Sequence, residues 1–373
     1  MRGSNRIRQI TEQGQALWLD FISRELLRSG KLRELINDGV TGVTSNPTIF
    51  HKSIAAGRDY DDQIRELARE GRSAYEIYEA LAIRDIQAAA DQLRNVYNET
   101  HGRDGYVSLE VNPKLAHDTE GTIAEARRLF AAVDRRNLMI KVPATAEGLP
   151  AMRTLIGEGI NVNVTLIFAI ARYEEVMQAY LDGLRILRRA ERPIGLVGSV
   201  ASFFVSRVDT LVDKLLGEKI AAGEHGLETL LGQAAVANAK IAYDCFKQVF
   251  ESDAFRDLRA AGARVQRPLW ASTSTKNPTY SPTKYVDALI GPHTVNTVPL
   301  HTLDEIRRHA APARTIDMDV KQAYGLVERL RGIGIRMEDV TEQLLREGVR
   351  LFADSFEALL ADLETKRARF AGR

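Results

Sequence analysis

Short runs of apolar and β-branched residues alternate with longer helical stretches along nearly the whole chain. This alternation predicts parallel strands joined by helical crossovers, because tight turns cannot connect parallel strands. For eight strands in 373 residues, the economical α/β fold is a closed (β/α)8 barrel of the TIM type with additional helices, and a doubly wound open sheet is the alternative. The predicted strands lie near 15–20, 40–44, 105–111, 138–142, 160–166, 195–201, 267–272 and 293–298.

The alternation of side chains within the strands favours the barrel. In the third strand, Val107, Leu109 and Val111 share one face, while Ser108 and Glu110 share the other. Each strand thus offers an apolar face to outer helices and a polar face to the interior. Because active sites of TIM barrels lie at the C-terminal ends of the strands, these polar residues predict a site at that mouth. A polar but inert interior is the competing interpretation.

Three segments exceed a minimal barrel. Charged sequence of helical pattern occupies the stretches near 50–104 and near 210–263, and further helices are expected near 317–370. We expect these helices to pack against the barrel or to cover its mouth. The chain, 1–373, is therefore interpreted as a single domain with helical insertions.

The fourth predicted strand contains a lysine, Lys141, among apolar residues. An ionised amine in an apolar interior is costly unless it is paired, so such a lysine tends to lose its proton. A neutral lysine is a nucleophile that can form a Schiff base with a carbonyl substrate. The alternative is a strand-end lysine that reaches solvent or pairs with a carboxylate.

Charge and cysteine content narrow the class of protein. A formal net charge of +1 argues against a broad surface for nucleic acid or membranes. No apolar run approaches the length of about 18 residues that a membrane-spanning helix needs. The single cysteine, Cys245, cannot form an intramolecular disulfide and fits a reducing compartment. A cytoplasmic protein is expected.

Polar residues near the C-terminal ends of the strands supply the groups that a Schiff-base aldolase needs. An amine attacks a ketone, the resulting iminium accepts electrons during carbon–carbon cleavage, and carboxylates move the protons. No organic cofactor is then required. A metal-dependent aldolase would instead need clustered histidines or thiolates, and the seven histidines show no such grouping. The residues concerned are Asp20, Asn46, Glu110, Lys141, Asn163, Thr165 and Ser202.

Six separated motifs resemble those of the transaldolase family and follow the family's order. The resemblance covers nearly the whole chain and is greater to the longer bacterial transaldolases than to the compact fructose 6-phosphate aldolases. The motifs are GVTSNPTIF at 42–50, VSLEV at 107–111, MIKVPAT at 139–145, NVNVTLIF at 161–168, GSVASFFVSRVD at 198–209 and WASTSTKN at 270–277.

The resemblance implies a role for each matching residue. Lys141 would form the Schiff base, and Glu110 would act through a water held partly by Thr165 to protonate and remove the carbinolamine hydroxyl. Asp20 would take the proton of the C4 hydroxyl during cleavage and return it during addition. The hydroxyls of the dihydroxyacetone unit would be held by Asn46, Asn163 and Ser202.

The resemblance also implies a phosphate site, with one departure from the family pattern. Arg207 matches the family arginine that follows the sixth strand and binds the acceptor phosphate. Compact transaldolases have a basic residue very soon after the Ala-Ser of the seventh strand, whereas here the first cation is Lys276. We expect Lys276 to bind phosphate together with nearby hydroxyls, and Ser272 is a better candidate than Ser274.

The implied activity is transfer of a dihydroxyacetone unit between ketose and aldose phosphates in the non-oxidative pentose phosphate pathway. Sedoheptulose 7-phosphate or fructose 6-phosphate would be the donor. Glyceraldehyde 3-phosphate or erythrose 4-phosphate would be the acceptor. Two alternatives remain open, a lyase that releases free dihydroxyacetone and a catalytically silent barrel that binds sugar phosphates. Transaldolases include monomers and homodimers, and the sequence does not decide between them.

Overall fold

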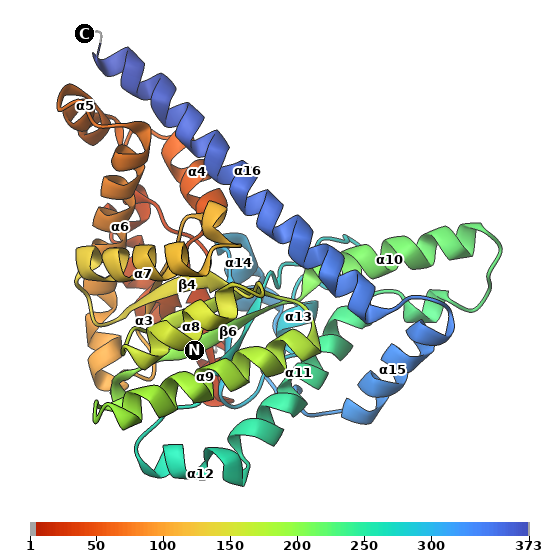
Figure 1. The fold of residues 1–373 in the computed structure, drawn as a ribbon. Helices are drawn as coiled ribbons and strands as arrows, with labels where there is room; N and C mark the ends of the chain where they lie inside the picture. Colours follow the sequence, from red (N-terminus) through yellow and green to blue (C-terminus); the bar gives the residue numbers. More distant parts are fainter. Residues whose placement is uncertain (1–4, 372–373) are drawn as a thin grey trace.

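Eight parallel strands close into a barrel in the computed structural model, which describes residues 5–371 (Figure 1). Each strand pairs with the next, and the last pairs with the first. The fold is therefore the predicted (β/α)8 barrel, and the open sheet is excluded. The strands are β1 (Gln15–Leu19), β2 (Val40–Val43), β3 (Val107–Glu110), β4 (Leu138–Pro143), β5 (Val162–Ile167), β6 (Ser199–Phe204), β7 (Arg267–Ala271) and β8 (Thr294–Val298).

The sixth strand lies later in the chain than the sequence predicted. The expected strand was 195–201, but Ile194–Leu196 forms a turn of 3-10 helix after Pro193, and β6 begins at Ser199. The apolar run before Ser199 has the composition of a strand but packs as a connection. As a result, Ser202 lies within β6 rather than beyond it.

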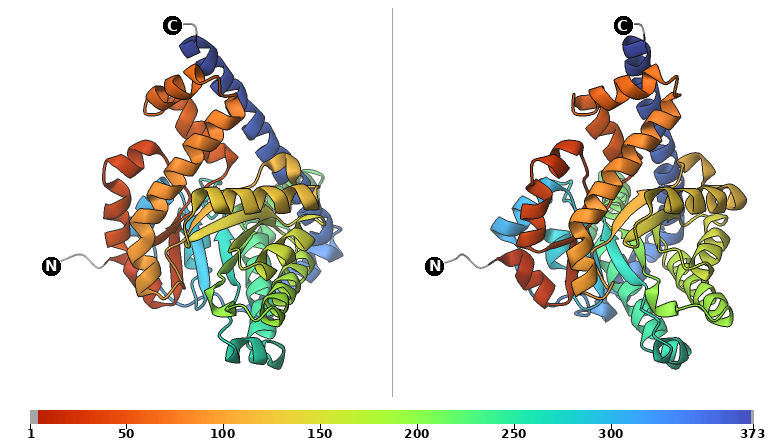
Figure 2. Two further views of the ribbon diagram at one scale, coloured as in Figure 1. Left: turned by 60° about the vertical axis from the view of Figure 1, so that its left-hand side comes forward. Right: turned by 90° about the vertical axis from the view of Figure 1, so that its left-hand side faces the viewer.

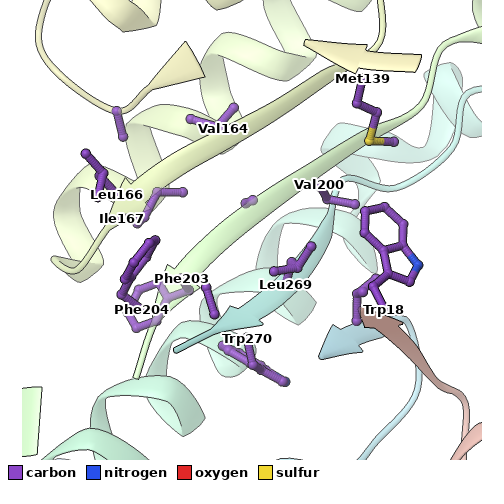
Figure 3. Packing of buried hydrophobic residues seen from close by; sticks show 14 of the residues in the cluster. Trp18, Met139, Val164, Leu166, Ile167, Val200, Phe203, Phe204, Leu269 and Trp270 are labelled. Atoms are coloured by element: carbon purple, nitrogen blue, oxygen red, sulfur yellow. The ribbon is translucent and has the colours of Figure 1, made fainter. Parts of the chain in front are cut away.

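The strand register places alternate side chains on opposite sides of the barrel wall. Glu110 is paired with Lys141, and Lys141 with Asn163, so these three residues lie side by side on neighbouring strands. The outward faces are apolar and pack against helices. The ring of Phe203, for example, meets Tyr173 of a surrounding helix edge to face with centroids 5.9 Å apart, and it meets Trp270 of the neighbouring strand at 6.1 Å (Figure 3).

Helices surround the barrel and fill the three segments in which extra helices were expected. Between β2 and β3 lie α4 (Pro47–Ala56), α5 (Asp61–Arg69) and α6 (Ala74–Glu99). Between β6 and β7 lie α10 (Ser206–Ala221), α11 (Ala234–Phe250) and α12 (Asp253–Ala260). The chain ends with α15 (Val320–Gly332) and α16 (Met337–Ala371). The other α-helices are α1 (Arg6–Glu12), α2 (Arg24–Arg28), α3 (Lys31–Asp38), α7 (Thr119–Val133), α8 (Gly148–Gly157), α9 (Ile170–Arg189), α13 (Lys284–Asp287) and α14 (Leu300–His309).

The 35-residue helix α16 runs diagonally past the barrel and alongside α4 and α5 (Figures 1 and 2). It approaches the end of β5 closely at Gly348, where a Cβ atom would lie 2.9 Å from a methyl group of Leu166. One side of α16 also packs on α6, where Phe356 meets Tyr78 edge to face with ring centroids 5.1 Å apart. Distant parts of the sequence are thereby held together over one end of the barrel.

None of the helices in the described part of the chain is long and apolar enough to cross a membrane.

Candidate active site

Lys141 lies in the interior of the barrel, on β4, with 4% of its surface exposed. Its amine lies 3.3 Å from Oε2 of Glu110 and donates a hydrogen bond of 3.1 Å to the carbonyl oxygen of Ser45. Both partners come from neighbouring elements, β3 and the end of β2, so the closed sheet itself fixes the position of the amine. The lysine is thus buried and paired rather than extended to solvent.

Glu110 is held in an environment that favours its neutral form. Burial raises the pKa of its carboxyl group, the charge of Lys141 opposes that rise, and the charge of Asp20 adds to it. Oε2 of Glu110 lies 3.3 Å from the Lys141 amine, and the buried hydroxyl of Thr165 has no hydrogen-bond partner among residues 5–371. A carboxyl group that retains its proton beside an amine can act as a proton donor to a group bound to that amine.

A cavity of about 380 Å³ opens at the C-terminal ends of the strands, as expected for the active-site end of a TIM barrel. Glu110 and Asn163 do not line it. The other eight residues predicted from the sequence do line it, namely Asp20, Asn46, Lys141, Thr165, Ser202, Arg207, Ser272 and Lys276.

Asn163 is fully buried and contacts other side chains rather than the cavity. Its amide nitrogen donates to Oγ of Ser108 at 3.0 Å, and its oxygen accepts from Oγ of Ser202 at 2.7 Å. The position differs from that expected of a residue that binds substrate directly. Because Asn163 fixes the hydroxyl of Ser202, it can orient a residue that does line the cavity.

Asn46 lines the cavity and also caps a helix. It is the N-cap of α4, and its Oδ1 accepts a 2.9 Å hydrogen bond from the backbone nitrogen of Ile49. The cap fixes the orientation of the side chain. Because Oδ1 is used by the cap, the amide nitrogen is the group left to donate to a ligand in the cavity that Asn46 lines.

Asp20 follows β1 and accepts a hydrogen bond from a threonine that was not among the predicted site residues. Thr44 donates a 2.7 Å hydrogen bond to Oδ1 of Asp20 and lies 2.8 Å from the hydroxyl of Thr297. Both threonines line the cavity. Their positions at the ends of β2 and β8 are the signal that could have found them.

Three cations line the cavity. Arg207 and Lys276 are joined there by Lys52, which lies on α4 and was not predicted. Burial lowers the pKa of Lys276, and the charges of Arg207 and Lys52 lower it further. Burial likewise lowers the pKa of Arg207. Such crowding of like charges is unfavourable alone and suits an anionic ligand.

The segment after β7 places two serines in the cavity wall. Ser272 has a left-handed backbone (φ 57°), and its Oγ lies 3.0 Å from that of Ser206 at the start of α10. Ser274 also lines the cavity, but its hydroxyl is paired with Thr302 at 2.8 Å. Lys276 lines the cavity despite its later position in the sequence.

The fold and site together define a class of protein, a (β/α)8 barrel with a buried amine at its C-terminal mouth, one carboxyl group in the same cavity and a second, buried carboxyl group beside the amine. Comparison with known proteins identifies the family. The family model for transaldolase/fructose-6-phosphate aldolase matches residues 17–363, and the chain therefore belongs to that family.

Similar proteins match over almost their full lengths. A transaldolase of Saccharopolyspora erythraea is 48% identical over 96% of this chain and 97% of its own. A transaldolase of Thermobifida fusca is 51% identical over 95% of this chain and 96% of its own. Transaldolase 2 of a Nostoc species is 46% identical over 97% of both chains.

Proposed function

We propose that this protein is a transaldolase that transfers a dihydroxyacetone unit from a ketose phosphate to an aldose phosphate through a Schiff base on Lys141. Sedoheptulose 7-phosphate and fructose 6-phosphate are the donors, and glyceraldehyde 3-phosphate and erythrose 4-phosphate are the acceptors, as in the non-oxidative pentose phosphate pathway. The observation that carries the proposal is the buried Lys141 amine, 3.3 Å from Glu110, in a mouth lined with cations. The names of the similar proteins support the same activity.

The first step joins the substrate to the protein. The amine of Lys141, once it has given up its proton, attacks the C2 carbonyl of the ketose and gives a carbinolamine. Glu110, whose raised pKa favours the protonated form, supplies the proton that lets the hydroxyl leave as water. Glu110 does not line the cavity, so a bridging water is needed, and the unpartnered hydroxyl of Thr165 can hold it.

The second step breaks the bond between C3 and C4. The carboxylate of Asp20 takes the proton of the C4 hydroxyl, the electrons of the C3–C4 bond move toward the iminium nitrogen, and the aldose phosphate leaves. An enamine remains on Lys141. Addition of an acceptor aldehyde reverses these steps, and Asp20 returns the proton. The hydrogen bond from Thr44 keeps the Asp20 carboxylate in place throughout.

Two groups of residues bind different parts of the substrate. Ser202 and Asn46 hold hydroxyls of the dihydroxyacetone unit. Asn163 orients Ser202 by accepting a hydrogen bond from its hydroxyl. Arg207 and Lys276 bind the phosphate, which relieves their mutual repulsion. Ser272 lines the same cavity and can contribute its hydroxyl.

The test separates transfer from lyase activity. Purified protein is incubated with fructose 6-phosphate, with or without erythrose 4-phosphate, and the products are identified by mass spectrometry. We expect sedoheptulose 7-phosphate only when the acceptor is present, and glyceraldehyde 3-phosphate should exceed one equivalent per protein only then. Free dihydroxyacetone in its absence would favour the lyase. No product from folded protein would favour the silent sugar-phosphate-binding barrel.

We also propose that residues 1–373 form one domain and that the protein acts in the cytoplasm, as a monomer or a homodimer. Packing of α16 against α4, α5, α6 and α10 supports a single domain. The single cysteine, Cys245, is buried and unpaired, which fits a reducing compartment.

A further inference from the structure

The fifth strand of the barrel is irregular at the point where it reaches the active site. The pairing of β5 with β6 places two residues, Thr165 and Leu166, opposite a single residue, Ser202. Leu166 has a left-handed backbone (φ 61°), which is unfavourable for a residue with a side chain. Bulges and strained residues of this kind persist where the surrounding structure holds them, and they are common beside active sites. The packing around this bulge therefore bears on the reaction.

The two residues of the bulge contact different parts of the molecule. Thr165 lines the mouth. Leu166 does not line the mouth and is 2% exposed. It lines a small cavity together with Val349 and Phe352, which both lie on α16. Because this cavity has a volume of about 10 Å³, it has room for about one water molecule. Leu166 is thus enclosed between the end of β5 and the long C-terminal helix.

The helix α16 reaches the bulge through a residue that has no side chain. Gly348 is buried within the helix, and a Cβ atom there would lie 2.9 Å from one methyl group of Leu166 and 3.7 Å from the other. By contrast, Gly217 on α10 and Gly325 on α15 have nothing within 4 Å of such an atom. A glycine inside a helix is unfavourable relative to alanine, so its presence at a close contact indicates that the contact requires it.

The same face of α16 carries the ring that lies over the reacting amine. Phe352 follows Gly348 by four residues, and residues four apart in a helix share a face. The centroid of its ring lies 5.9 Å from Nζ of Lys141, and its side chain lines the mouth. The separation of the helix from β5 at Gly348 therefore sets the separation of the ring from the amine.

We infer that Gly348 and Leu166 are positioning residues, whose contact seats α16 against the bulge in β5 and thereby holds the ring of Phe352 over the amine of Lys141. The consequence for the reaction rests on the proposed function. The ring keeps water from the enamine on Lys141 until an aldehyde arrives.

A looser contact changes the fate of the enamine. When water reaches it, the enamine carbon takes up a proton and becomes an iminium. A water molecule then adds to the iminium carbon, the bond between that carbon and the nitrogen of Lys141 breaks, and dihydroxyacetone leaves with the amine restored. One water molecule is consumed in total. Substitutions that separate α16 from β5 should therefore shift the protein from transfer toward release of dihydroxyacetone.

The first test does not depend on catalysis. Folded protein is treated with a trace of acetic anhydride, and peptide mass spectrometry gives the acetylation of Lys141 relative to that of Lys276, which lines the same mouth. We expect this ratio to rise about tenfold in Gly348→Leu and less in Gly348→Ala, because the larger side chain moves α16 farther from β5. The matched controls are Gly217→Leu and Gly217→Ala, at an exposed helical glycine with open space around it, and they should leave the ratio unchanged.

Replacement of Leu166 identifies the contact. Leu166→Ala removes both methyl groups that a side chain at residue 348 would meet. In that background, Gly348→Ala should raise the acetylation ratio less than it does in the wild type. Gly348→Ala adds only one methyl group, so it carries the test if circular dichroism shows that Gly348→Leu does not fold. An equal rise in both backgrounds, or an unchanged ratio in the folded Gly348 variants, would overturn the inference.

The second test measures the consequence for the reaction. With fructose 6-phosphate and no acceptor, Gly348→Ala should release dihydroxyacetone faster than the wild type, whereas Gly217→Ala should match the wild type. A wild-type protein that forms neither an adduct nor a product would refute the proposed function, and the acetylation ratio would still decide the contact. Normal transfer by the wild type, with a raised ratio but no extra release in the Gly348 variants, would overturn the water-excluding role of the contact and leave the proposed function standing.

Discussion

The amine of Lys141 and the carboxyl group of Glu110 lie 3.3 Å apart, with side chains 6% and 5% exposed. The two residues face each other across the pairing of β3 with β4, so the closed sheet holds the distance between them. Burial of the pair raises the pKa of Glu110. A nucleophile and a proton donor are thereby placed together before any substrate arrives.

The raised pKa of Glu110 makes its contribution to stability depend on pH. A carboxyl group whose pKa is higher in the folded state than in the unfolded state stabilises the fold fully at a pH below the unfolded-state pKa, here 4.5. This contribution is lost as the pH rises through the folded-state pKa. We expect the free energy of unfolding of the wild type, minus that of Glu110→Gln, to fall with rising pH. The fall is about 1.4 kcal/mol for each unit by which the pKa is raised. Urea unfolding across this range measures it, and parallel curves for the two proteins would contradict the assignment.

Replacement of Asp20 by Asn should stop the reaction after the Schiff base has formed. Without the carboxylate, the C4 hydroxyl keeps its proton and the C3–C4 bond stays intact, so kcat should fall about 10²- to 10⁴-fold. Borohydride added with fructose 6-phosphate should then trap the whole ketose phosphate, identified by intact mass. The control is Asp38→Asn, whose carboxylate pairs with Arg307 and does not line the mouth. A three-carbon adduct on the Asp20→Asn protein would argue against this role.

Loss of Arg207 should impair phosphorylated substrates selectively. A hydrogen bond to a charged group contributes about 1.5–3 kcal/mol, so Arg207→Gln should lower kcat/KM for erythrose 4-phosphate about 10- to 100-fold. The value for unphosphorylated erythrose should change little. Lys214→Gln, on the same helix and 70% exposed, serves as the control. Equal losses for both acceptors would show that Arg207 acts on the fold instead.

The ring of Phe352, on α16, covers the reacting amine. Its centroid lies 5.9 Å from Nζ of Lys141, and its side chain lines the mouth. Phe352→Ala should cost about 3–5 kcal/mol of stability and admit water to the enamine, so that more dihydroxyacetone is released without an acceptor.

The matched control for Phe352→Ala is Phe356→Ala, one helical turn later. Phe356 packs on Tyr78 and does not line the mouth, so its loss should destabilise the protein without raising this release. Free dihydroxyacetone released by each variant is measured by gas chromatography. Both variants are assayed at the same temperature, below the melting transition of either. The same release from both variants would contradict a water-excluding role for Phe352.

The barrel and the position of Lys141 could be predicted because they depend on local patterns. Period-two alternation within a strand predicts which of its side chains face the interior. Because the strands are parallel, their C-terminal ends lie at the same end of the barrel. The start of β6 was misplaced because an apolar run at 194–197 looks like a strand but forms a connection.

Other parts of the site depend on long-range packing. Lys52 and Phe352 reach the mouth only because α4 and α16 pack together over it, and no pattern within either helix reveals that arrangement. Asn163 was predicted to bind substrate, whereas its contact with Ser202 rather than the cavity follows from the register of β5 and β6.

The central claim is a covalent bond between Lys141 and the substrate. Borohydride reduction in the presence of fructose 6-phosphate, followed by intact mass and peptide mapping, tests it most directly, with Lys141→Ala as the control. The account predicts a stable three-carbon adduct on the peptide that contains Lys141 and none on the variant. An unmodified wild-type protein that is folded, or an adduct on another lysine, would contradict it.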